Sequence, residues 1–200
     1  MTEILVLYYS RGGSVARLAR QIARGVGEVP GARARLRTVP PVAPVTREAA
    51  PPEPEDGAPY VEASDLAECA GFVLGSPTRF GNMAAPVKYF LDTLGAEWAS
   101  GTLVGKPAAV FTSTATQHGG QESTILSTHT VLLHHGMVVV GLPYTFQGQM
   151  IQGEVSGGSP YGASTIAAGD GSRQPSQNEL DGARFQGRHV AAIAARLARA

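Results

Sequence analysis

Residues 3–15 read EILVLYYSRGGSV and set a pattern that the rest of the chain repeats. The first seven residues are almost all apolar, which is typical of a buried strand in a parallel sheet. The serines and glycines that follow predict a tight turn. Apolar residues then recur at helical spacing, at Val15, Leu18, Ala19, Ile22, Ala23 and Val26. The stretch therefore predicts a strand, a turn and a helix in direct succession.

The same alternation continues along the chain. Further strands are predicted at 33–39, 69–74, 107–112 and 137–140. Helical patterns are found at 87–94, 125–133 and 190–197, and Ser176 with Glu179 forms a capping box that starts the last helix. Strands alternating with helices predict an α/β fold. We expect a flavodoxin-like, doubly wound parallel sheet of five strands, in the order 2-1-3-4-5, with helices on both faces.

Length and composition fit one domain over residues 1–200, with 16 basic and 16 acidic residues and a hydrophobic fraction of 43%. Zero net charge argues against nucleic acid as a partner. No apolar run approaches the ~18 residues of a membrane span, and the N-terminus does not resemble a targeting peptide. These features favour a cytoplasmic protein. Two long loops are expected, a proline-rich one at about 40–64 and a glycine-rich one at 143–175, the second ordered by packing.

The residues just after each strand are the candidates for chemistry, because ligands of such sheets bind at the carboxyl ends of the strands. Residues 10–15 (SRGGSV) place two glycines and two serines at a helix N-terminus, which predicts a phosphate cradle. A tight turn with a serine cap would explain the same residues. The loop matches neither the Walker A motif nor G-x-G-x-x-G.

Two further loops fall at the same edge of the predicted sheet. Residues 75–83 (GSPTRFGNM) supply a stiff proline, polar side chains and an aromatic ring. Residues 113–120 (STATQHGG) supply hydroxyls and main-chain N–H groups that could meet a planar heterocycle, with no acid before Glu122. For a bound flavin, the missing negative charge favours two-electron over one-electron chemistry.

Six segments of the chain carry a family resemblance. LVLYYS-x-x-G (5–13), GSPTRFGNM (75–83), LGAEWASG (94–101), GGQE (119–122), LHHGMVVV (133–140) and GGSPYGAST with GDGSRQPSQ-x-EL (157–180) resemble the WrbA-type NAD(P)H:quinone oxidoreductases. These are flavodoxin-like FMN proteins, and the match runs almost the full length in order. The resemblance implies two-electron reduction of quinones to hydroquinones with NADH or NADPH, by ping-pong hydride transfer through FMN. It also implies a homotetramer and a protective role against quinone (oxidative) stress.

The resemblance further implies individual contacts. FMN phosphate is expected on Ser10, Arg11, Gly12, Gly13, Ser14 and Val15. The flavin ring is expected against Pro77, Thr78, Arg79, Phe80 and Gly81, and against Ser113, Thr114, Ala115, Thr116, Gln117, His118 and Gly119. His134 is expected to reach a flavin across a subunit boundary, and Trp98, Gly12 and Phe80 to line the substrate pocket. Flavin N5 carries the chemistry, and no side chain is assigned as a catalytic acid or base.

Simpler explanations stay open for several of these residues. Trp98 would serve equally in a core or an interface, and His134 would be explained by the favourable charge of a helix C-terminus. No ligand spacing predicts a metal site, and Cys69 is expected to be an inert core residue that begins a strand. A one-electron carrier and a non-catalytic FMN-binding regulator are the alternative functions. Zero net charge argues against the carrier, which would need an acidic face for steering.

Overall fold

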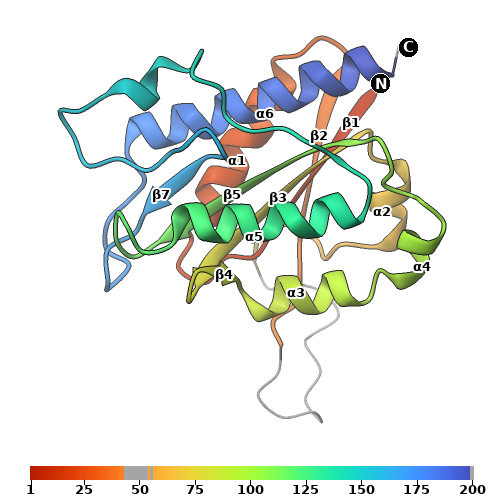
Figure 1. The fold of residues 1–200 in the computed structure, drawn as a ribbon, viewed down its shortest axis with the longest axis horizontal. Coiled ribbons are helices and arrows are strands. Elements are labelled where there is room, and N and C mark those ends of the chain that lie inside the picture. The colour runs from red at the N-terminus through yellow and green to blue at the C-terminus, as the bar shows by residue number, and fades with distance from the viewer. Residues whose placement is uncertain (43–53, 55, 199–200) are drawn as a thin grey trace.

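The computed structural model describes residues 1–42, 54 and 56–198, and it shows helices packed around one central sheet (Figure 1). Residues 43–53 and 55 of the expected proline-rich loop lie outside the described residues. The strands are β1 (Thr2–Tyr8), β2 (Ala32–Thr38), β3 (Gly71–Arg79), β4 (Asn82–Met83), β5 (Pro107–Thr114), β6 (Val138–Val139) and β7 (Ser164–Ile166). The helices are α1 (Ser14–Gly27), α2 (Ala63–Glu68), α3 (Ala85–Asp92), α4 (Gly95–Ala99), α5 (Gln121–His134), the 3₁₀ turn η1 (Gln147–Met150) and α6 (Gln177–Leu197).

The sheet has the predicted topology. Its strands run in the order β2-β1-β3-β5-β6, which is the expected 2-1-3-4-5 order of a flavodoxin-like fold, and these neighbours pair in parallel. The position beyond β5 is divided between two short strands. β6 pairs with the start of β5 at Pro107 and Ala108, whereas β7 pairs with its end, from Thr112 to Thr114. The predicted strand at 137–140 is therefore shorter than expected, because β7 occupies the second half of that edge.

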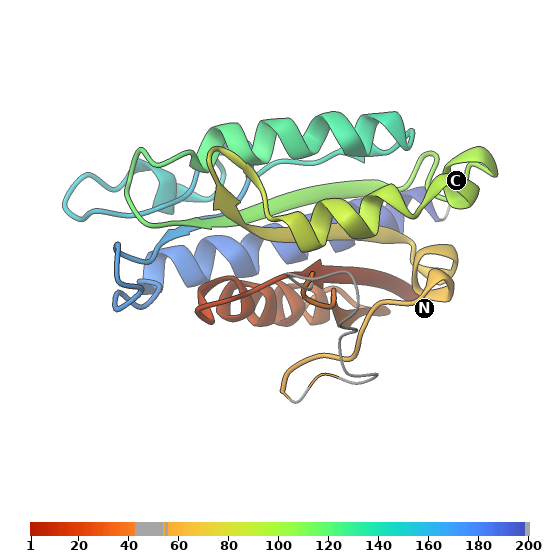
Figure 2. The same ribbon diagram turned by 90° about the horizontal axis from the view of Figure 1, so that it is seen from below.

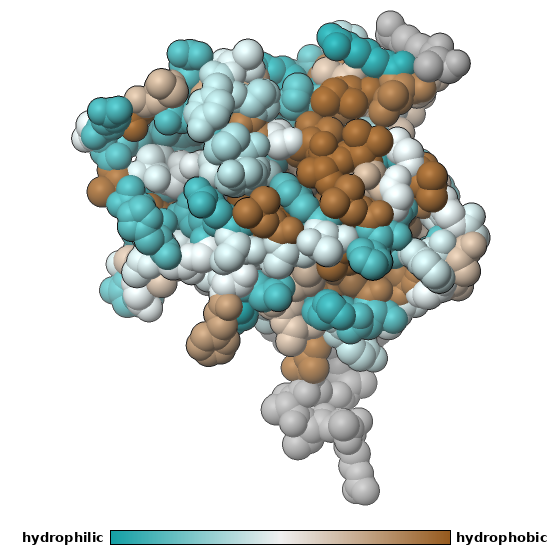
Figure 3. All heavy atoms as spheres, viewed as in Figure 1, coloured by the Kyte–Doolittle hydropathy of each residue, from teal (hydrophilic) through white to brown (hydrophobic). Residues whose placement is uncertain are grey.

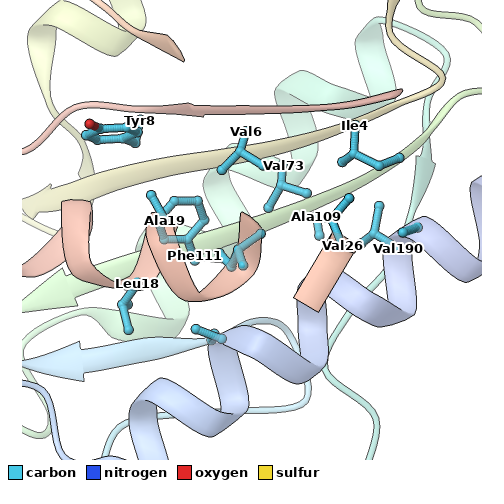
Figure 4. Close-up of a cluster of buried hydrophobic side chains, with 14 of the residues drawn as sticks. Ile4, Val6, Tyr8, Leu18, Ala19, Val26, Val73, Ala109, Phe111 and Val190 are labelled. Atoms are coloured by element: carbon cyan, nitrogen blue, oxygen red, sulfur yellow. The ribbon is translucent and has the colours of Figure 1, made fainter. Parts of the chain in front are cut away.

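Helices cover both faces of the sheet (Figure 2). Alternate residues of β1 explain this arrangement, since successive side chains of a strand point to opposite faces. Ile4 and Val6 join the buried cluster formed with α1 and α6, which Figure 4 shows in part. Leu5 and Leu7 join a second cluster formed with α3 and α5. The rigid three-layer core fixes the carboxyl ends of β1, β3 and β5 side by side.

Several elements were not predicted from the sequence. α2 has only one buried apolar residue, Leu66, and so carries almost no periodic signal. Cys69 follows α2 and precedes β3, so the prediction that it begins a strand is wrong, although it is buried as expected. Its thiol donates to the Leu66 carbonyl at 3.3 Å, and burial raises the pKa of the Cys69 thiol. In the described part of the chain, no helix is long and apolar enough to cross a membrane.

Candidate functional site

The predicted loops meet around one cavity of about 630 Å³ at the carboxyl ends of β1, β3 and β5, here called the rim cavity. This volume lies within the range of small-molecule sites. The lining includes eleven of the predicted site residues, namely Ser10, Arg11, Gly12, Ser14, Val15, Pro77, Thr78, Arg79, Ser113, Thr114 and Ala115. Residues far apart in the sequence are therefore brought to one place by the parallel sheet.

The first wall is the start of α1. Gly13 is the N-cap, at φ 83°, and it has no side chain that could cap the helix. The first helical hydrogen bond runs from the Arg17 N–H to the Gly13 carbonyl at 3.0 Å, so the N–H groups before it have no partner within the helix. The Ser10 hydroxyl accepts from the Ala16 N–H at 3.3 Å and closes the turn. This end of α1 can thus bind an anion through its free amides and its dipole.

The second wall is a hairpin that presents an aromatic ring. Arg79 of β3 pairs with Asn82 of β4, and the two-residue turn between them has φ 52° at Phe80 and 79° at Gly81. Positive φ at both positions is typical of the hairpin turn of type I′. It is costly for a bulky residue, and such strain concentrates at functional sites. The Phe80 side chain is fully exposed at the tip, where it can cover a planar ligand.

The third wall begins inside a strand, because β5 extends to Thr114, two residues further than predicted. The Thr114 hydroxyl donates to the Thr116 carbonyl at 2.7 Å and accepts from the Gln121 side chain at 3.2 Å, which folds the loop back onto α5. Gln117 and His118 do not line the rim cavity. They line a neighbouring hollow of about 390 Å³, together with Ser156 and Ser159.

A fourth wall was missed by the sequence analysis. Residues 167–171, directly after β7, complete the rim cavity, and Ala168 has φ 64°. Ala168 and Phe80 are the two non-glycine residues with positive φ in the described part of the chain. Ala168 lines this cavity, whereas Phe80 is not in the lining and directly follows Arg79, which is. Hydrogen bonds from the N–H and the hydroxyl of Ser172 hold the pKa of the Asp170 carboxyl below its ordinary value. The signal that could have identified this wall is the strand-length STI sequence followed by Gly169, Asp170 and Gly171.

Residues 2–149 match the family model described as NADPH-dependent FMN reductase. The chain belongs to the NADPH-dependent FMN reductase family. It is 58% identical over 200 residues to the NAD(P)H dehydrogenase (quinone) of Paracoccus denitrificans, covering 98% of this chain and 96% of that protein. It is 55% identical to the protein of the same name from Geobacter sulfurreducens, covering 98% of each. The resemblance drawn from the motifs is thereby confirmed.

Solved structures agree with the fold of this reductase family. The WrbA-like protein from Agrobacterium tumefaciens matches with a TM-score of 0.70 at 21% identity, covering 98% of this chain and 99% of that one. Flavodoxin 1 from Bacillus cereus matches with a TM-score of 0.61 at 17% identity, covering 96% of this chain and 98% of that one. These likenesses support the flavodoxin-like arrangement of the sheet.

Two predicted site residues of this family member lie together but away from the rim cavity. The indole N–H of Trp98 donates to the main-chain carbonyl of His134 at 2.9 Å. α5 begins beside the rim cavity and ends at His134, and its 14 residues span about 20 Å. Figure 1 accordingly shows α4, which carries Trp98, at the opposite end of α5 from the β4 hairpin. Trp98 and His134 therefore form one unit that does not line the rim cavity of their own chain.

Proposed function

We propose that this chain is an FMN-dependent NAD(P)H:quinone oxidoreductase that holds FMN in the rim cavity. The observation that carries the proposal is the open N-terminus of α1 at the carboxyl edge of the sheet, beside a strained aromatic hairpin. The relatives named NAD(P)H dehydrogenase (quinone) support the same activity. Residues 1–200 would act as one domain.

The residues of the rim cavity fit FMN in charge and shape. Residues 10–15 would hold the phosphate through main-chain amides, because the free amides at the start of α1 favour an anion. Thr78, Arg79 and Phe80 would cover one part of the flavin ring, and residues 113–119 would meet its pyrimidine edge. Ser113 and Thr114 are rigidly placed at the end of β5, so this edge is fixed by the sheet.

Bound FMN would supply hydride chemistry, accepting two electrons from NADH or NADPH and passing them to a quinone. The chain would bind and orient the two substrates in turn in one cleft, which gives ping-pong kinetics. Residues 113–119 include no acid, so they place no negative charge beside the ring. The exposed Phe80 ring would exclude water from the bound substrate.

Trp98 and His134 would complete the site from a second copy of the chain in a homotetramer. Trp98 is the only tryptophan of the chain, and 59% of its surface is exposed. So much exposure is unusual for a large aromatic side chain. Large exposed apolar side chains also occur on α5, on β6 and before β5, namely Leu126, Leu133, Val138 and Val104. Figure 3 shows apolar side chains gathered where the chain leaves α5 and crosses toward α6. Exposed apolar surface of this kind marks protein–protein interfaces.

The test compares Gly12→Asp with Gly12→Asn. A Cβ at Gly12 would meet nothing within 4 Å, so both side chains fit. The aspartate repels the phosphate whereas the asparagine does not, so we expect FMN affinity to fall at least about tenfold in Gly12→Asp relative to Gly12→Asn. FMN binding is measured from flavin fluorescence, and activity from NADH and NADPH oxidation with benzoquinone. Equal FMN affinity in the two variants, or turnover no faster than free FMN in the unaltered protein, would refute the proposal.

A further inference from the structure

A second cavity, of about 790 Å³, lies on the other side of the β3–β4 hairpin and is called here the hairpin cavity. It is formed by residues after β1, the hairpin, α3 along its length and Val42, which follows β2. Its size lies within the usual range for a small-molecule ligand. Arg11 and Arg79 line both this cavity and the rim cavity. The two cavities are therefore adjacent, with these two side chains between them.

The hairpin cavity is positively charged. Arg11, Arg79 and Lys88 contribute three cations, and Asp92 contributes one anion. Lys88 is paired with Asp92, one helical turn along α3. Within the described residues, neither Arg11 nor Arg79 forms an ion pair, and the Arg79 guanidinium donates only to the main-chain carbonyl of Thr78, at 2.7 Å. Two guanidinium groups are thus available to an anionic ligand, and such groups bind phosphate well.

Aromatic rings complete the lining. Tyr9 follows β1, and Tyr89 lies on α3 with 63% of its surface exposed. An exposed tyrosine beside free guanidinium groups suits a ligand that carries both a planar base and phosphates, since bases stack on aromatic rings. The total volume of the hairpin cavity leaves room for such a ligand without displacement of the core residues beneath it.

We propose that the hairpin cavity binds the adenosine-phosphate half of NADH or NADPH. Arg11 and Arg79 would hold the phosphates, and the tyrosines would contact the adenine. The nicotinamide end would then pass over these two arginines into the rim cavity. This inference rests on the proposed function, and it adds a site for the half of the nucleotide that takes no part in hydride transfer.

The Lys88–Asp92 pair allows a test that separates charge from structure. Lys88→Gln removes a cation and leaves the Asp92 carboxylate facing the cavity, whereas Asp92→Asn removes the anion and frees Lys88. Both variants lose the same ion pair. We expect the KM for NADH to rise about fivefold in Lys88→Gln and to fall two- to threefold in Asp92→Asn. The anionic ligand would be repelled by the unpaired Asp92 carboxylate in the first variant and attracted by the unpaired Lys88 ammonium group in the second. A purely structural role would shift both variants in the same direction.

A hydride donor without phosphates provides the internal reference. 1-Benzyl-1,4-dihydronicotinamide carries the reactive ring alone, so its kcat/KM with benzoquinone should change less than twofold in both variants. Arg24→Gln, which removes an exposed cation at the end of α1, is the matched control and should leave the KM for NADH unchanged. Equal shifts, or none, in the two α3 variants would overturn the hairpin cavity as the nucleotide site. Failure of the unaltered protein to oxidise either donor would instead remove the proposed function itself.

Discussion

The hydroxyl of Thr124 on α5 donates a 2.8 Å hydrogen bond to the hydroxyl of Thr78 at the end of β3. The same Thr78 oxygen accepts from the Gly81 N–H at 3.2 Å. One side chain therefore fixes the hairpin that presents Phe80 and also ties it to the start of α5. At this junction a Cβ on Gly120 would lie 3.0 Å from the Cα of Gly81. The hairpin and the helix thus approach each other through two glycines, and the position of the aromatic ring depends on that approach.

The first prediction concerns Gly120→Ala. Gly120 has φ 97°, so any side chain costs about 1–2 kcal/mol of backbone strain. The added methyl group also pushes against the hairpin, which should move Phe80 and lower FMN affinity about fivefold. Gly105→Ala is the control, because Gly105 has φ 75° and open space around its Cβ position. We expect a similar loss of stability there with unchanged FMN binding, as measured by urea unfolding and flavin fluorescence.

The second prediction concerns the fully buried carboxylate of Glu179 in α6. It accepts hydrogen bonds from the Gly157 N–H at 2.9 Å and the Thr165 hydroxyl at 2.8 Å, and Arg173 lies 3.0 Å away. Glu179→Gln leaves the cation and several N–H donors without a charged acceptor. We expect the free energy of unfolding to fall by about 3–5 kcal/mol in urea.

Exposed Glu154, in the same long segment, supplies the matched control. Glu154→Gln should change the free energy of unfolding by less than about 0.5 kcal/mol. If Glu179→Gln were equally mild, the carboxylate would not be what orders the segment that ends in the fourth wall of the rim cavity.

Glu179 also shows what the sequence could and could not reveal. The capping box with Ser176 is a local pattern, three residues apart, and the structure confirms it. The contacts of the same carboxylate with Gly157 and Thr165 depend on the pairing of β7 with β5, across about fifty residues of chain. No periodicity within 143–175 encodes that pairing. For this reason the three walls at the carboxyl ends of the strong strands β1, β3 and β5 were predicted, whereas the fourth wall was not.

The ion pairs between β2 and α2 were also not predicted from the sequence. The alternation at 33–39 predicted a half-exposed edge strand, and β2 is indeed the edge strand of the sheet. Nothing local indicated that Arg35 and Arg37 of β2 both bind Asp65 of α2, thirty and twenty-eight residues away. The buried position of Asp65 depends on these two partners, since an unpaired buried carboxylate would be costly.

The third prediction follows from Asp65. Burial alone would raise the pKa of this carboxyl, but hydrogen bonds from the Glu62 N–H, Arg37 and Arg35 outweigh burial and hold the pKa below its ordinary value. A depressed pKa in the folded state means that the ionised carboxylate stabilises the protein above pH ~4. This contribution is lost as the pH falls below ~4 and through the folded-state pKa.

Asp65→Asn tests this linkage. At pH 7 the variant should unfold about 2–4 kcal/mol more easily than the unaltered protein. The difference should stay constant from about pH 5 to 8 and narrow below pH 4, where the aspartate also becomes neutral. Urea unfolding at a series of pH values measures it. If the difference in the free energy of unfolding widened on acidification, the pKa of Asp65 could not be lowered in the folded protein.

The last prediction concerns the Trp98–His134 unit. Because it lies about 20 Å along α5 from the rim cavity of its own chain, it can act on a flavin only in another subunit.

Two defective chains should therefore complement each other. A Gly12→Asp chain would lose the proposed phosphate site, whereas a Trp98→Ala/His134→Ala chain would lose the proposed donated unit. After co-expression, random assembly places an intact FMN site next to an intact unit in about one quarter of cases. The mixed oligomer, purified through a different tag on each chain, should recover about a quarter of the quinone reductase activity. Activity no greater than the mean of the two parents would mean that each chain builds its site alone.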